Sequence, residues 1–153
     1  MARKTGKRKV VLASGVFDLL HLGHVKFLEE AKKAGGTNAE LIVIVARDST
    51  VQRTKGRQPV MSENQRRALV ESLRVVDEAF LGLEHFDIGD VIDRIKPDVI
   101  ALGYDQRVME HKVCTYVKKH GLSVKTVRVG KFEQDELDSS SKIRQKIMEN
   151  FDR

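Results

Sequence analysis

Short runs of apolar, β-branched residues alternate along the chain with longer segments whose apolar residues recur at helical spacing. Five such runs predict strands, and several are continuously apolar, as strands covered on both faces are: residues 10–13, 41–46, 78–81, 99–102 and 124–129. This alternation is typical of βαβ units. We therefore expect an α/β fold with a five-stranded parallel sheet and helices on both faces.

Helical periodicity fills the intervals between these runs. One helix starts near Val25 and ends at Gly35-Gly36, and a capping box of Ser62 and Gln65 opens another. Three more helices are predicted, at residues 88–95, 108–120 and 141–151. Two stretches, residues 48–61 and 130–139, read as irregular. Both follow the carboxyl ends of strands, where open α/β folds bind ligands, so we expect functional residues there.

The length of 153 residues corresponds to one domain, which we place at residues 9–153 after a basic, flexible N-terminal tail at residues 1–8. No apolar run is long enough to cross a bilayer, so we expect no membrane partner. The basic start lacks the apolar stretch of a secretion signal, and we expect a cytoplasmic protein. The single cysteine, Cys114, excludes an internal disulfide.

The net charge of +6 favours anionic partners. Much of this charge lies in the tail, and aromatic residues make up only 5% of the chain, with no tryptophan to stack on bases. A nucleic-acid partner is therefore disfavoured, and a small anionic substrate explains the charge equally well. The sequence contains neither a P-loop nor a Gly-x-Gly-x-x-Gly fingerprint, which removes the main support for kinases and dehydrogenases.

The segment after the first predicted strand, residues 14–24, carries the most chemical information. Gly15 lets a backbone approach a ligand closely, and Gly23 keeps the start of the next helix open. His21 and His24 lie three residues apart, so a first helical turn presents both imidazoles to one spot beside free backbone N–H groups. Such a spot suits phosphate.

Two other interpretations of this segment exist. The histidines can be a structural pair, or they can bind a metal ion together with Asp18. A zinc site normally needs three protein ligands, and no further Cys or His cluster supplies the rest. We therefore predict no metal site made by protein side chains.

A second candidate lies near the C-terminus, where Ser139, Ser140 and Ser141 open a helix and Lys142 and Arg144 follow. Small hydroxyls at a helix start can cap N–H groups or, together with those groups, cradle a phosphate. The basic side chains add positive charge. The alternative is a plain helix cap with solvated basic residues.

The loop after the second strand offers a further basic group, in which Arg53, Lys55 and Arg57 surround Gly56. From their position alone, these side chains can either contact a phosphate or belong to a solvated surface loop. The roles of Arg66 and Arg67 on the next helix are also undecided: each can reach the site or lie on an exposed helix face.

After the fourth strand, Gly103 permits close approach of a ligand, and Asp105 can accept hydrogen bonds from a base or a ribose. A simple turn is the alternative for this segment. Arg128 ends the fifth strand and is a further candidate, whose role the sequence leaves open.

Residues 15–24 resemble the Gly-x-Phe-Asp-x-x-His-x-Gly-His signature of the cytidylyltransferase-like nucleotidyltransferases and match each of its fixed positions. Residues 139–144 look like the second signature of the same family. The resemblance implies a single Rossmann-like domain that joins a nucleoside triphosphate to a phosphorylated molecule and releases pyrophosphate. It implies four catalytic residues: His21, His24, Lys55 and Arg144. It further implies these nucleotide-binding residues: Gly15, Val16, Phe17, Asp18, Gly23, Gly103, Asp105, Arg128, Ser139, Ser140 and Ser141.

Within that family, residues 45–48, 55–57, 63–67 and 102–106 look most like the archaeal FAD synthases, which transfer AMP from ATP to FMN. The alternatives are a glycerol-3-phosphate cytidylyltransferase that uses CTP and a nucleotide-binding protein without turnover. The resemblance also implies a divalent ion, most simply Mg²⁺, bound mainly through the triphosphate. It implies a homodimer as well.

Overall fold

The computed structural model describes residues 6–85, 87–132 and 137–152 of the chain. Within them, one parallel sheet has the strand order β3-β2-β1-β4-β5. Its strands are β1 (Val10–Gly15), β2 (Glu40–Val45), β3 (Glu78–Leu81), β4 (Val99–Gly103) and β5 (Lys125–Val129). The chain builds outward from β1 to β3 and then returns to the other side of β1 with β4. The point where the direction of building reverses therefore lies between β1 and β4, where open α/β sheets bind ligands.

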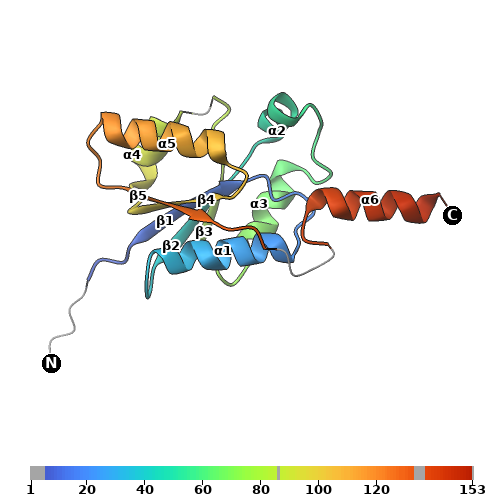
Figure 1. The fold of residues 1–153 in the computed structure, drawn as a ribbon, viewed down its shortest axis with the longest axis horizontal. Coiled ribbons are helices and arrows are strands. Elements are labelled where there is room, and N and C mark those ends of the chain that lie inside the picture. The colour runs from blue at the N-terminus through green and yellow to red at the C-terminus, as the bar shows by residue number, and fades with distance from the viewer. Residues whose placement is uncertain (1–5, 86, 133–136, 153) are drawn as a thin grey trace.

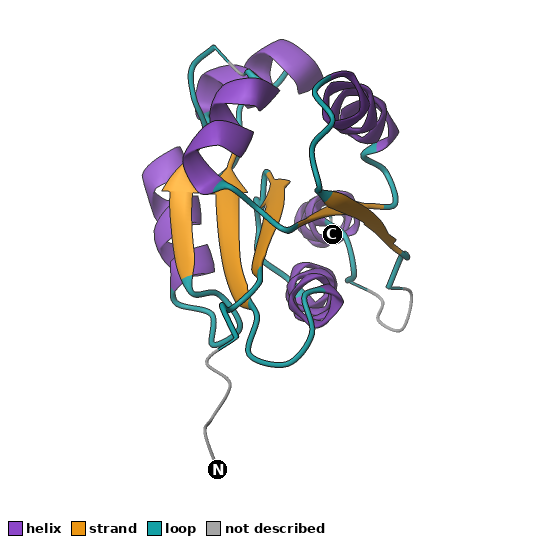
Figure 2. Ribbon diagram, turned by 90° about the vertical axis from the view of Figure 1, so that its left-hand side faces the viewer, coloured by secondary structure: helices purple, strands orange, loops and turns teal. Residues whose placement is uncertain are grey.

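Helices cover both faces of this sheet, as Figure 1 shows. The described helices are α1 (Leu22–Ala34), α2 (Asp48–Lys55), α3 (Glu63–Glu71), α4 (Ile88–Ile95), α5 (Arg107–Lys119) and α6 (Ser140–Phe151). In Figure 1, α4 and α5 lie together on one side of the strands and α1 on the other, while α6 extends away from the body. Figure 2 shows the strands between these layers from the side.

Alternate residues of each central strand pack into separate cores on the two faces. Val11 of β1 packs with Leu28 of α1 and Val70 of α3 in the larger core. Leu12, the next residue, packs with residues of α4 and α5, among them Val113, in the smaller core. Burying each such side chain stabilises the fold by about 1.5–3 kcal/mol. The continuous apolar runs of the sequence thus reflect a sheet covered on both sides.

The predicted fold is confirmed, with five strands and five helices close to the expected positions. One prediction is wrong: residues 48–61, expected to be irregular, begin with helix α2. Val51 is the only residue of α2 that is buried, so the helix has no apolar stripe to reveal it. Its start is held by tertiary contacts instead. The Asp48 N–H donates to Glu63 Oε2 at 2.8 Å, and the Glu63 N–H donates to Asp48 Oδ2 at 3.3 Å.

The predicted N-terminal tail, residues 1–8, lies largely outside the described residues. Of its last residues, Arg8 donates from Nε to the Asn38 carbonyl at 2.8 Å. The second irregular stretch, residues 130–139, is described only in part. Among the helices that the structure describes, none has the length and apolar character needed to span a membrane.

Candidate active site

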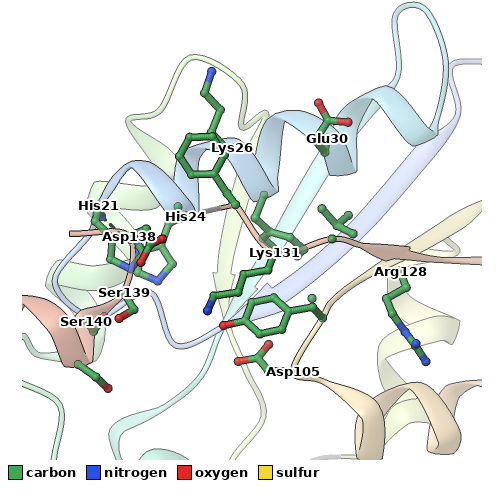
Figure 3. A pocket seen from close by; sticks show the side chains of 18 of the residues that line it. His21, His24, Lys26, Glu30, Asp105, Arg128, Lys131, Asp138, Ser139 and Ser140 are labelled. Atoms are coloured by element: carbon green, nitrogen blue, oxygen red, sulfur yellow. Dashed lines mark hydrogen bonds between the residues drawn. The ribbon is translucent and has the colours of Figure 1, made fainter. Parts of the chain in front are cut away.

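A cleft of about 1020 Å³ opens between α1, the ends of β4 and β5, the C-terminal end of α2 and the first turn of α6. It brings together predicted residues from distant parts of the chain. The predicted residues that line it are His21, Gly23, His24, Lys55, Gly103, Asp105, Arg128, Ser139, Ser140, Ser141 and Arg144. Figure 3 shows His21, His24, Asp138, Ser139 and Ser140 grouped at one end, with Asp105 and Arg128 further along. The two histidines and the serine-started helix therefore share one cavity.

The two imidazoles are stacked at the start of α1. Their ring centroids lie 3.8 Å apart with an interplanar angle of 25°. His21 is the N-cap residue of the helix, and its backbone N–H donates to His24 Nδ1 at 3.3 Å. Because Nδ1 of His24 accepts this bond, a neutral His24 carries its proton on Nε2. His24 thus presents an N–H donor on the side of its ring away from the backbone.

Both histidines are held in the neutral form. Burial lowers the pKa of His24 to about 3; electrostatic repulsion from His21 and from the Lys55 charge adds to this effect, while Asp18 opposes it. Burial also lowers the pKa of His21, against the attraction of Asp138. The pair therefore offers hydrogen-bond donors and acceptors to a ligand near pH 7, and full positive charge must come from lysine and arginine.

The serine turn at the start of α6 makes three different contacts. Ser139 caps the helix by accepting the Lys142 N–H at 3.2 Å, as a plain helix cap does. The Ser140 hydroxyl donates to the Asp18 carbonyl oxygen, which ties α6 to the loop after β1. Arg144 Nη2 donates to Ser141 Oγ at 3.3 Å. The turn thus anchors α6 on the histidine loop, which is the segment of residues 16–21 between β1 and α1, and keeps Arg144 at the cleft.

Four predicted nucleotide-binding residues, Gly15, Val16, Phe17 and Asp18, are not among the residues that line the cleft. A Cβ on Gly15 would lie 3.0 Å from the Phe17 ring, so this glycine makes room for a neighbouring side chain. Phe17 itself is buried and has a positive φ of 54°, which is uncommon for a bulky residue. Its ring packs 5.4 Å from that of His24. Phe17 thus supports His24 from a position outside the cleft lining.

Asp18 is buried and holds the loop before α3. Its Oδ2 accepts the Val60 N–H at 2.8 Å, and its Oδ1 accepts the Met61 N–H at 3.0 Å. Arg144 Nη1 lies 4.0 Å from Asp18 Oδ2. Asp18 therefore links the histidine loop to two other segments that border the cleft.

Gly23 is required by a close approach that the sequence does not reveal. A Cβ there would lie 2.6 Å from the Asp138 backbone oxygen and 2.9 Å from the His21 ring. Asp138, which sequence reasoning did not single out, has a side chain only 1% exposed and pairs with Lys142 Nζ at 2.7 Å. That hydrogen bond lowers the pKa of Asp138. In the sequence, only its position directly before the serine turn could have indicated that Asp138 belongs to the site.

Lys55 and Arg57 line the cleft from the end of α2. Gly56 between them has a φ of +69° and ends the helix in the left-handed conformation that glycine favours. The lysine and the arginine are exposed, and Lys55 is close enough to His24 to lower its pKa. Together with Arg144 they give this end of the cavity a positive lining.

The turn after β4 lines the other part of the cleft. A Cβ on Gly103 would lie 3.0 Å from Asp105 Oδ1, so glycine allows the turn to fold tightly. Arg128 also lines the cleft, but its Nε and Nη2 donate to Glu110 Oε2 at 2.9 and 2.6 Å. In Figure 3 the Arg128 side chain points away from the histidines. A nucleotide would compete with Glu110 for this guanidinium.

Arg66, which the sequence left open between site and surface, is fully buried. Its guanidinium donates to the Met61, Val16 and Ala46 carbonyls at 3.0, 2.7 and 2.8 Å. Its Nη2 also pairs with Asp48 Oδ1 at 2.6 Å. Arg66 thus holds together the segments that follow β1 and β2. Its neighbour Arg67 pairs with Glu71 on the helix surface.

No group of three or more His, Cys, Asp or Glu side chains in the described part of the chain is arranged to hold a metal ion. Oxygen atoms of a triphosphate are themselves good ligands for Mg²⁺. A divalent ion that arrives with a nucleotide would not require ligands from such a cluster.

Comparison with known proteins finds relatives that match nearly the whole chain. The chain is 47% identical over 150 residues to the FAD synthase of Methanothermobacter marburgensis, covering 96% of this chain and 92% of that protein. It is 49% identical over 139 residues to the FAD synthase of Thermoplasma volcanium, covering 91% of this chain and 94% of that one.

Among solved structures, the crystal structure of a lipopolysaccharide core biosynthesis protein from Thermoplasma volcanium superposes with a TM-score of 0.73 at 47% identity, covering 82% of this chain and 98% of that chain. A pantothenate synthetase from Thermus thermophilus matches with a TM-score of 0.62, covering 89% of this chain and 61% of that chain, at an identity of 19% that shows the fold alone. The model of the cytidylyltransferase-like family matches residues 12–146, a span that contains both histidines and the serine turn. The chain therefore belongs to the cytidylyltransferase-like family.

Proposed function

We propose that this protein is an FMN adenylyltransferase, which transfers AMP from ATP to FMN to give FAD and pyrophosphate. The observation that carries the proposal is the convergence of His21, His24, Lys55 and Arg144 on one cleft. Relatives named FAD synthase, 47% and 49% identical over nearly the whole chain, support the choice of FMN and ATP.

In the proposed reaction, a phosphate oxygen of FMN attacks the α-phosphorus of ATP. A new P–O bond forms, and the bond from the α-phosphorus to the bridging oxygen breaks, so that its electron pair leaves with pyrophosphate. The attacking phosphate is ionised at neutral pH, so the step needs no general base. Catalysis must then come from alignment and from donors placed where negative charge grows.

The cleft contains groups suited to these tasks. The neutral His24 offers its Nε2–H as a hydrogen-bond donor to a phosphate oxygen, and its Nδ1 bond to the His21 backbone fixes the direction of that donor. Lys55 and Arg144 provide permanent positive charge for the triphosphate or the FMN phosphate. Magnesium, bound by the triphosphate, would neutralise part of its charge. Asp105 would accept a hydrogen bond from the ribose.

A direct assay tests this proposal. Purified protein is mixed with ATP or CTP, with FMN or glycerol 3-phosphate, and with Mg²⁺, and the product is identified by chromatography and mass spectrometry. FAD formed from ATP and FMN, with release of pyrophosphate, supports the proposal. CDP-glycerol as the main product would instead identify a glycerol-3-phosphate cytidylyltransferase, and nucleotide binding without pyrophosphate release would identify a protein without turnover. The same samples, run with and without a chelator, test the requirement for Mg²⁺. The proposed homodimer is tested by sedimentation of the purified protein.

A further inference from the structure

Gln106 occupies the N-cap position of α5, yet its side chain makes no cap bond to that helix. Its Oε1 accepts the Gly103 backbone N–H at 2.8 Å, and its Nε2 donates to the Ser14 carbonyl at 3.1 Å. These two partners fix the orientation of the amide, because a backbone N–H only donates and a carbonyl only accepts. One side chain therefore bridges two strands that are far apart in the sequence.

The bridge stands where the sheet opens. Pairing between β1 and β4 ends at Ala13 and Ala101, although both strands continue beyond these residues. On its other edge, β1 stays paired with β2 as far as Gly15. The opening therefore lies only between β1 and β4, at the point where open α/β sheets bind their ligands. The Gln106 amide replaces the missing strand-to-strand hydrogen bonds with a side-chain link.

The two ends of the bridge lead to different parts of the cleft. Ser14 leads into the loop that ends at His21 and opens α1 with His24, whereas Gly103 begins the turn that presents Asp105. Gln106 itself is not among the residues that line the cleft, whereas Gly103 and Asp105 are. Gln106 packs directly against Gly103, which does line the cleft: a Cβ on Gly103 would lie 3.4 Å from Gln106 Oε1.

We propose that Gln106 is a positioning residue that fixes the separation between the turn of residues 103–105 and the two histidines. This inference rests on the proposed nucleotidyl transfer in this cleft. In-line attack requires the nucleoside to be held at one place while its α-phosphorus is held at another. Misplacement by about 1 Å can lower the rate about 100-fold. Because the sheet makes no backbone bonds at this point, the Gln106 amide determines that separation.

The test compares Gln106→Ala and Gln106→Glu with Val108→Ala, a control in the first turn of α5 at a residue that is 73% exposed. In Gln106→Ala we expect the Gly103 amide hydrogen to exchange roughly tenfold faster or more, because its acceptor is gone. We expect kcat/KM for ATP to fall by about ten- to 100-fold, through weaker nucleotide binding as well as a lower kcat, because the nucleoside and the α-phosphorus are no longer held at the right separation. Val108→Ala should match the unmodified protein in both measurements.

Gln106→Glu provides a second readout that a merely structural role would not change. An ionised glutamate accepts from Gly103 but cannot donate to Ser14, whereas a protonated glutamate restores both bonds. Its activity relative to the unmodified protein should therefore rise as the pH falls toward the range where glutamate is protonated. The activity of Gln106→Ala, measured in the same way, should show no such rise.

Other results of these measurements would contradict the positioning role of Gln106. Unchanged exchange of the Gly103 amide in Gln106→Ala would show that the bridge does not form. If the Gly103 amide exchanges faster in Gln106→Ala but kcat/KM equals that of the unmodified protein, the bridge has no positioning role. If the unmodified protein makes no FAD, the proposed function fails, and titration with ATP and with CTP then tests Gln106 by itself: weaker binding by Gln106→Ala than by Val108→Ala supports the inference, and equal binding or none overturns it.

Discussion

Replacing Arg66 by methionine should be the most destabilising single change near the cleft. Methionine retains much of the apolar volume but removes every donor, so three partly buried carbonyls, those of Val16, Ala46 and Met61, lose their partner. Each unsatisfied acceptor costs about 1–3 kcal/mol, less where water enters. Asp48 is 33% exposed and regains solvent, so its share of the ion pair is small.

Together these effects predict a loss of about 3–5 kcal/mol in the free energy of unfolding, against a typical total of about 5–15 kcal/mol. The melting temperature should fall by about 6–20 °C. Urea denaturation followed by circular dichroism measures this loss. The matched control is Arg67→Met, which removes the pair with Glu71 and a long hydrogen bond, 3.4 Å, to the Ala79 carbonyl, and should cost about 1 kcal/mol or less. If Arg66→Met came within about 1 kcal/mol of that control, the assignment of Arg66 as the link between the loops would be wrong.

Four further predictions concern the cleft. His24→Ala should lower kcat for FAD formation by about 100- to 1000-fold without a change in fold, whereas His111→Ala on the exposed part of α5 should not; an active His24→Ala would remove its catalytic role. Lys55→Ala should lower kcat/KM about tenfold or more, measured against Lys119→Ala, because a cation near the phosphates is lost; equal kinetics would contradict the phosphate contact. Gly23→Ala should abolish most activity, since its Cβ would meet the Asp138 backbone at 2.6 Å, whereas Gly6→Ala has open space and should not. Finally, the pKa of His24 is lowered from 6.5 to about 3, so its contribution to stability is full above pH 6.5 and is lost as the pH falls toward 3. Unfolding measured across that range should show a steeper loss for the unmodified protein than for His24→Gln, and parallel curves would refute the shift.

The sequence by itself determined the five strands, five of the six described helices and the chemistry that they carry. Strand β3 and helix α4 were predicted to the residue, at Glu78–Leu81 and Ile88–Ile95, because apolar periodicity and local stop signals fix such elements. The first motif placed two histidines at a helix start through their spacing alone. The parallel order of the sheet then made it predictable that His24 and Ser140 would meet.

Only the tertiary structure decided how polar groups from distant segments pair. Helix α2 depends on contacts between Asp48 and Glu63, and the burial of Arg66 depends on carbonyls that other loops supply. Gln106 likewise finds its partner 92 residues away, at Ser14. Periodicity reports which face of an element is apolar, but a polar side chain reads the same whether it meets water or a buried partner. The identity of that partner follows only from the packing of the whole chain.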